Sequence, residues 1–122
     1  MAAVGAQDKD AWLALWAADG CVEDPVGPSW LDPSGQGHRG KPAIGAFYDA
    51  TIATLDGIRF EIHDSFACGS EVANVATIHL SLPGGTTARC EGVFVYAVDD
   101  EGLLRSLRAF WETDRMTATM TS

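Results

Sequence analysis

The chain has 122 residues and a formal net charge of −9; 47% of its residues are hydrophobic and 20% are charged. This length suits one domain spanning residues 1–122, and the apolar content is too high for a disordered chain. The acidic balance argues against nucleic acid or an anionic membrane as a partner. No stretch approaches the roughly 18 apolar residues of a membrane span, and MAAVGAQDKD lacks the basic flank and apolar run of a signal peptide.

The first expected element is a short helix over residues 8–20, DKDAWLALWAADG. Trp12, Leu15 and Trp16 fall at i, i+3 and i+4, which is typical of one apolar helix face. Asp8 offers an N-cap and Gly20 a stop signal.

A loop rich in glycine and proline follows over residues 27–41, with Trp30 and Leu31 as its large apolar side chains. His38 and Arg39 lie in this loop, where we expect them to be solvated. A second helix is predicted over 41–57, KPAIGAFYDATIATLDG, because Pro42 suits the first turn and apolar residues repeat at helical spacing.

After Gly57 the pattern changes to alternation. Four strands are predicted, over residues 58–67, 71–82, 86–98 and 103–114. The connections PGG and DDEG have hairpin length, so the last three strands are expected to form an antiparallel meander. Two helices followed by four strands indicate an α+β fold with the helices on one face of a curved sheet.

Alternation also predicts which side chains share a face. Cys90, Gly92, Phe94 and Tyr96 form one row of the third strand, and the opposite row is also largely apolar. A helix pair covers one face, so we expect the other to meet a second subunit in a homodimer.

Three cysteines, Cys21, Cys68 and Cys90, lie beside apolar residues without CxxC spacing. A disulfide framework needs a denser pattern, so we expect free thiols and a cytoplasmic location. His63 and His79 lie in separate strands without metal-ligand spacing, so no metal site is expected.

The stretch CVEDPVGP places Glu23 and Asp24 before a proline and among apolar residues. Proline pushes the preceding residue into an extended conformation, which fixes the direction of Asp24. A carboxylate held in apolar surroundings has a raised pKa and suits a general base. The alternative is a solvent-facing turn in which Asp24 accepts bonds from nearby backbone amides.

The segments GCVEDPVG, HRGKPAIGAFY and LLRSLRAFWE, together with the loop between the first two, resemble the ketosteroid isomerase branch of the NTF2-like (SnoaL-like) superfamily. Within it the chain looks most like mycobacterial steroid-isomerase-like proteins. The resemblance runs from about Trp12 to Trp111. It implies a cone, in which helices close a curved antiparallel sheet around an apolar cavity that holds a steroid-like ligand without a cofactor.

The resemblance also implies roles for residues. Asp24 corresponds to the base that moves a proton between C4 and C6 of a Δ5-3-ketosteroid, and Tyr48 to a tyrosine of the active-site hydrogen-bond network. Trp16 stands where one branch has another tyrosine of that network. The residues expected along the ligand are Val22, Trp16, Phe47, Cys90, Gly92, Phe94, Trp111 and Trp30.

Two departures from the family pattern concern the oxyanion hole. The family's oxyanion tyrosine would precede Met1, since AAVGAQ corresponds to the tail of a first helix that is mostly absent. Its second oxyanion group, a protonated aspartate, corresponds to Gly92, and a bulge would be needed to turn Glu91 inward. One such donor contributes roughly a hundred- to thousandfold in rate.

The leading hypothesis is therefore a Δ5 to Δ4 ketosteroid isomerase-like protein. The alternatives are a non-catalytic protein that binds a steroid or another hydrophobic ligand, and another NTF2-like activity such as polyketide cyclisation or epoxide hydrolysis. Epoxide hydrolysis would need an Asp-Arg-Asp set, which the sequence does not place.

Overall fold

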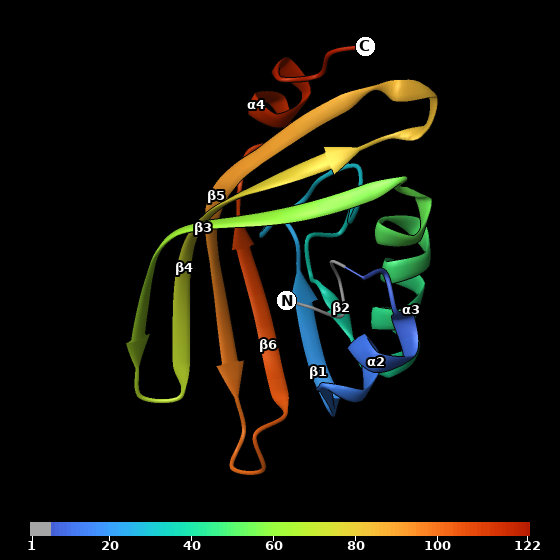
Figure 1. The fold of residues 1–122 in the computed structure, drawn as a ribbon. Helices are drawn as coiled ribbons and strands as arrows, with labels where there is room; N and C mark the ends of the chain where they lie inside the picture. The colour runs from blue at the N-terminus through green and yellow to red at the C-terminus, as the bar shows by residue number, and fades with distance from the viewer. Residues whose placement is uncertain (1–5) are drawn as a thin grey trace.

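A computed structural model describes residues 6–122 and contains a six-stranded, strongly curved sheet with the strand order β2-β1-β6-β5-β4-β3 (Figure 1). The strands are β1 (Trp16–Glu23), β2 (His38–Arg39), β3 (Gly57–Cys68), β4 (Glu71–Ser81), β5 (Thr87–Val98) and β6 (Leu104–Phe110). The helices are α2 (Lys9–Ala14), α3 (Lys41–Ala50) and α4 (Thr113–Ala118), with 3-10 turns η1 (Ile52–Thr54) and η2 (Pro83–Gly85). The expected α+β cone, a curved sheet with helices over one face, is confirmed.

The four strands β3 to β6 form the predicted antiparallel run, each pairing with its neighbour along the chain. Their alternation puts Ala88, Cys90 and Phe94 into the core, while Val93 and Phe110 point to the opposite face. Short connections between alternating segments were sufficient to predict this part of the sheet.

The first predicted helix is wrong in its second half. Asp8 caps α2 by accepting from the amide of Ala11 at 3.1 Å, but the helix ends at Ala14. Residues from Trp16 onward form strand β1, which pairs in parallel with β6. Trp16 is fully buried in this arrangement. Its backbone is paired within the sheet, and its indole still enters the core, as it would have done from a helix.

Two other predicted boundaries shift. The second helix stops at Ala50 and continues only as η1, and the last strand stops at Phe110, before α4. The assignment of AAVGAQ to the tail of a helix falls mainly on residues 1–5, which lie outside the described residues.

The core lies between α2, α3 and the concave face of the sheet (Figure 1). Trp12 packs edge-on against Trp16 with ring centroids 5.7 Å apart, and against Tyr48 at 5.3 Å. Ile44 of α3 is fully buried beside them. This aromatic core fills one end of the cone and leaves the other end hollow.

Candidate active site

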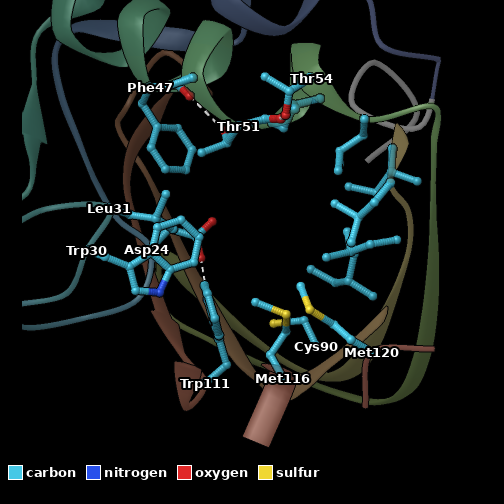
Figure 2. A pocket seen from close by; sticks show the side chains of 17 residues that line it. Asp24, Trp30, Leu31, Phe47, Thr51, Thr54, Cys90, Trp111, Met116 and Met120 are labelled. Atoms are coloured by element: carbon cyan, nitrogen blue, oxygen red, sulfur yellow. Dashed lines mark hydrogen bonds between the residues drawn. The ribbon is translucent and has the colours of Figure 1, made fainter. Parts of the chain in front are cut away.

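The hollow end of the cone is an apolar cavity of about 230 Å³ (Figure 2). Its walls come from the concave sheet, from α3 and η1, from the loop that follows β1, and from the C-terminal segment. The lining includes Asp24, Trp30, Leu31, Phe47, Thr51, Thr54, Cys90, Trp111, Met116 and Met120. Aliphatic side chains of β3 and β4 complete the lining, among them Ile58, Ile78 and Leu80.

A smaller cavity of about 60 Å³ adjoins this one, and we call it the inner cavity. Both cavities share Asp24, Phe47, Ile52, Ile58 and Ile78 in their walls, so Asp24 lies at their junction. The inner cavity is further lined by Trp12, Phe60, Phe94, Tyr96 and Leu107. Together the volumes approach the lower end of the ~300–1,000 Å³ found for small-molecule sites.

Asp24 follows directly after the last residue of β1. The parallel pairing of β1 with β6 continues to Glu23 opposite Arg108, and the amide of Val26 donates to the carbonyl of Ala109 at 2.9 Å. Parallel strands end at the same edge of a sheet, so Asp24 meets the residue that follows β6. That residue is Trp111, whose Nε1–H donates to Oδ1 of Asp24 at 2.5 Å (Figure 2).

Burial raises the pKa of Asp24, because an apolar cavity disfavours the charged carboxylate. The hydrogen bond from Trp111 lowers this pKa in part, and the nearby His38 lowers it further. Asp24 thus combines an apolar setting with one fixed donor. This is the environment of a carboxylate that binds a proton more readily than an exposed aspartate does.

Glu23, the other acid of the pair, turns away from the cavity. Its Oε2 lies 3.4 Å from Nε of Arg108, and Arg108 also lies over the ring of Phe110. Glu91 is exposed and lies 3.9 Å from the Arg115 guanidinium, so no bulge turns it inward. The cavity therefore has one carboxylate, Asp24, among the described residues of its lining.

The structure brings together five of the expected ligand-lining residues. Trp30, Phe47, Cys90 and Trp111 line the larger cavity, and Phe94 lines the inner one. Cys90 has a raised pKa because of burial and the nearby Asp24 charge, so its thiol stays protonated and serves as an apolar wall.

Tyr48, Trp16 and Val22 lie elsewhere. Each is buried in the core and is absent from the linings of both cavities. Tyr48 is adjacent to Phe47 on α3, but the helical turn directs its ring towards Trp12. Its hydroxyl is buried without a hydrogen-bond partner among the described residues, and burial raises its pKa.

Gly92 occupies a position where a side chain does not fit. A Cβ added there would lie 2.2 Å from the carbonyl oxygen of Phe110 and 3.0 Å from Cβ of Trp111. Gly92 therefore lets the chain after β6 cross close to β5, and this crossing carries Trp111 into the cavity. The same close approach leaves no room for an acidic side chain at this position.

The structure adds two residues to the site. His38, expected in solvent, lies in β2 with its ring 4.9 Å from that of Phe47, and its Nε2 is buried without a partner among the described residues. Tyr96 lines the inner cavity together with Asp24. Strand alternation had already put Tyr96 on the row of Cys90, so its position was predictable while its closeness to Asp24 was not.

Residues 6–122 contain no cluster of three or more His, Cys, Asp or Glu side chains able to hold a metal ion. Within the same range, no helix has the length and apolar character needed to cross a membrane.

A family model described as "SnoaL-like domain" matches residues 1–107. The chain belongs to the SnoaL-like family. No curated protein matches it. Among solved structures, this SnoaL-like domain is similar to the Δ5-3-ketosteroid isomerase from Mycobacterium sp., with 38% identity and a TM-score of 0.87 over 98% of this chain and 89% of that one.

Two further structures share this level of similarity. Rv0760c from Mycobacterium tuberculosis, solved in complex with estradiol-17β-hemisuccinate, is 36% identical with a TM-score of 0.87, over 99% of the SnoaL-like chain and 91% of its own. A computationally designed 17-OHP binder is also 36% identical with a TM-score of 0.87, over 98% of this chain and 89% of that one.

Proposed function

We propose that this protein isomerises a Δ5-3-ketosteroid, or a similar polycyclic ketone, to the Δ4 form by intramolecular proton transfer. The observation that carries the proposal is the position of Asp24, a buried carboxylate at the junction of two apolar cavities with a fixed indole donor. The similarity to a mycobacterial enzyme of this activity supports it.

In this reaction the Asp24 carboxylate takes a proton from C4 of the ketone, and the electrons of the C–H bond form a dienolate. The carboxylic acid then returns the proton to C6, so the substrate is neither oxidised nor reduced. A base with a raised pKa suits both steps, because it binds the proton more readily than an exposed aspartate and still releases it. The apolar walls exclude water that would otherwise exchange with the transferred proton.

The test is the rise in ultraviolet absorbance when androst-5-ene-3,17-dione is converted into its conjugated Δ4 isomer. We expect activity that falls about 10²- to 10⁴-fold in Asp24→Asn, which removes the base and keeps the shape of the side chain. Conversion that is absent, or that continues unchanged in Asp24→Asn, would contradict the proposal.

A second candidate is a carrier or sensor that binds a steroid without converting it. Gly92 favours it, because the close approach of Phe110 leaves no room for an acidic oxyanion donor there. The steroid complex of Rv0760c and the designed steroid binder show that proteins similar to this chain hold such ligands. Under this alternative, Asp24→Asn leaves steroid affinity unchanged or slightly improved, and no isomer accumulates.

We also propose a homodimer formed through the convex face of the sheet. Val75, Val93 and Phe110 lie opposite one another on three adjacent strands of this face, and all three are exposed. Such an apolar row on a sheet face suits burial against a second copy.

The three thiols are free, which supports a reducing compartment such as the cytoplasm.

A further inference from the structure

A ketone in the cavity needs a hydrogen-bond donor, and the walls offer few candidates. The lining of the larger cavity includes the hydroxyls of Thr51 and Thr54, but both already donate to backbone carbonyls. Thr51 bonds the carbonyl of Phe47 at 2.7 Å and Thr54 that of Thr51 at 2.6 Å. Figure 2 shows the hydroxyl of Thr51 directed at this carbonyl and away from the cavity centre.

The indole groups are also unsuitable as donors to a ligand. Trp111 donates to Asp24, and Trp30 lies at the cavity mouth with 66% of its surface exposed, where water competes with a ligand for its N–H. Trp12 lines the inner cavity, but its Nε1 has almost no accessible surface and cannot meet an atom of a ligand. The Cys90 thiol is a weak donor.

Tyr96 differs from all of these. It extends from β5 into the lining of the inner cavity, which Asp24 also lines. Its hydroxyl is not among the inaccessible, unbonded polar atoms of the described residues, and no hydrogen bond to it is found within that part of the chain. Desolvation and the Asp24 charge raise its pKa, so the hydroxyl keeps its proton at neutral pH.

We propose that the Tyr96 hydroxyl donates a hydrogen bond to the ketone oxygen of the bound ligand and so fixes its orientation. The ketone-bearing ring then lies at the inner cavity beside Asp24, and the remaining rings fill the larger apolar cavity towards Trp30. This inference rests on the proposed function, since it names the group that orients the same ligand for the same base.

The test compares two steroids that differ in one oxygen, androst-4-en-3-one and androst-4-ene, in binding to wild-type protein and to Tyr96→Phe. One neutral hydrogen bond corresponds to about a three- to tenfold change in affinity. We expect Tyr96→Phe to weaken binding of the ketone by about this factor and to change binding of androst-4-ene less than twofold. An equal effect on both steroids would overturn the assignment.

Tyr48→Phe makes the same chemical change at the other of the two tyrosines in the chain. A ketone-specific loss that is larger in Tyr48→Phe than in Tyr96→Phe would show that the wrong phenol has been assigned. Failure of wild-type protein to bind either steroid would overturn the proposed function together with this inference. Isomerisation that depends on Asp24 and is accompanied by no ketone-specific effect of Tyr96→Phe would overturn this inference alone.

A spectroscopic measurement covers the case in which Tyr96→Phe does not fold. Wild-type protein labelled with ¹³C at the tyrosine ζ carbon gives two signals, which Tyr48→Phe assigns. Adding androst-4-en-3-one is expected to shift the Tyr96 signal more than that of Tyr48, and more than androst-4-ene shifts it. Equal shifts with the two steroids would contradict a bond to the ketone oxygen.

Discussion

Trp111 donates its indole hydrogen to the Asp24 carboxylate although 87 positions separate the two residues in the sequence. The parallel pairing of β1 and β6 makes this possible, because both strands end at the same edge of the sheet. The bond stabilises the charged form of Asp24 against the effect of burial. The buried carboxylate and the group that moderates its pKa are therefore held by one strand pair.

Trp111→Phe removes this donor, so the pKa of Asp24 is expected to rise further. In the proposed reaction the ionised carboxylate is the base, so isomerase activity is expected to increase with pH as Asp24 loses its proton. We expect the acidic limb of the pH–kcat/KM profile to move to higher pH in Trp111→Phe. A carboxyl ¹³C titration of Asp24 checks the cause directly, and an unchanged or lower pKa would contradict it.

Asp24→Asn is expected to raise thermal stability at neutral pH. The pKa of Asp24 is higher in the folded state than in the unfolded chain, so ionisation favours unfolding. This destabilisation is absent below the unfolded pKa of about 3.9 and grows as the pH rises towards the folded value. The difference in Tm between variant and wild type should thus be close to zero near pH 3 and increase as the pH rises; a constant difference would point to a packing effect.

Gly92→Ala is expected to lower the free energy of unfolding by about 1–3 kcal/mol, because the added Cβ overlaps the Phe110 carbonyl. Urea unfolding measures the loss. Gly57→Ala is the control, since its Cβ would meet Ser81 at an ordinary 3.5 Å. Equal stability of the two variants would show that the approach of Phe110 to β5 is not tight.

Asp32 is expected to hold the loop over the cavity in a pH-dependent way. Its Oδ2 accepts a hydrogen bond from the backbone amide of Gly37 at 2.8 Å, and its Oδ1 accepts one from the hydroxyl of Ser34. The hydrogen bond from Gly37 holds the pKa of Asp32 below its usual value. The stabilisation is complete above the unfolded pKa of about 3.9 and is lost as the pH falls through the folded pKa.

Hydrogen exchange of the Gly37 amide is the measurement. We expect Asp32→Ala to speed this exchange several-fold at pH 6, where the carboxylate of the wild type is ionised. Exchange at the wild-type rate in the variant would mean that the loop is held without Asp32.

Val93→Glu places a charge in the centre of the exposed apolar row and is expected to convert a dimer into a monomer. Sedimentation velocity measures the change. Leu15→Glu, an equally polar change at an exposed residue at the end of α2, serves as the control. A wild type that sediments as a monomer would contradict the proposed dimer.

Sequence patterns predicted the antiparallel part of this fold because its pairings are local. The alternation in β5 and β6 and the short turn between them indicate which residues of the two strands pair. The pattern around Trp16 was ambiguous, since the same spacing suits a helix face and the start of a strand. The partner of that strand lies near the other end of the chain, and no local pattern reveals such a pairing.

The candidate site, like the fold, could be predicted from the sequence only in part. An acid before a proline among apolar residues left open whether Asp24 faces a cavity or solvent, and the structure places it in the cavity wall. The alternation put Tyr96 on the row of Cys90. The direction of Tyr48 was not evident, because one helical step of about 100° separates a cavity-facing Phe47 from a core-facing neighbour. The contact between Asp24 and Trp111 depends on the parallel strand pair and required the structure.

Met116 and Met120, which α4 and the segment after it carry into place, form part of the wall of the larger cavity and do not line the inner one. Methionine is unbranched and polarisable, so this wall can adjust to ligands of different length and outline. Discrimination among ligands is therefore expected to be graded along the cavity. Under the proposed function it is expected to be strict at the ring that bears the ketone and tolerant at the substituents that contact the two methionines, so compounds that differ in those substituents should share the site.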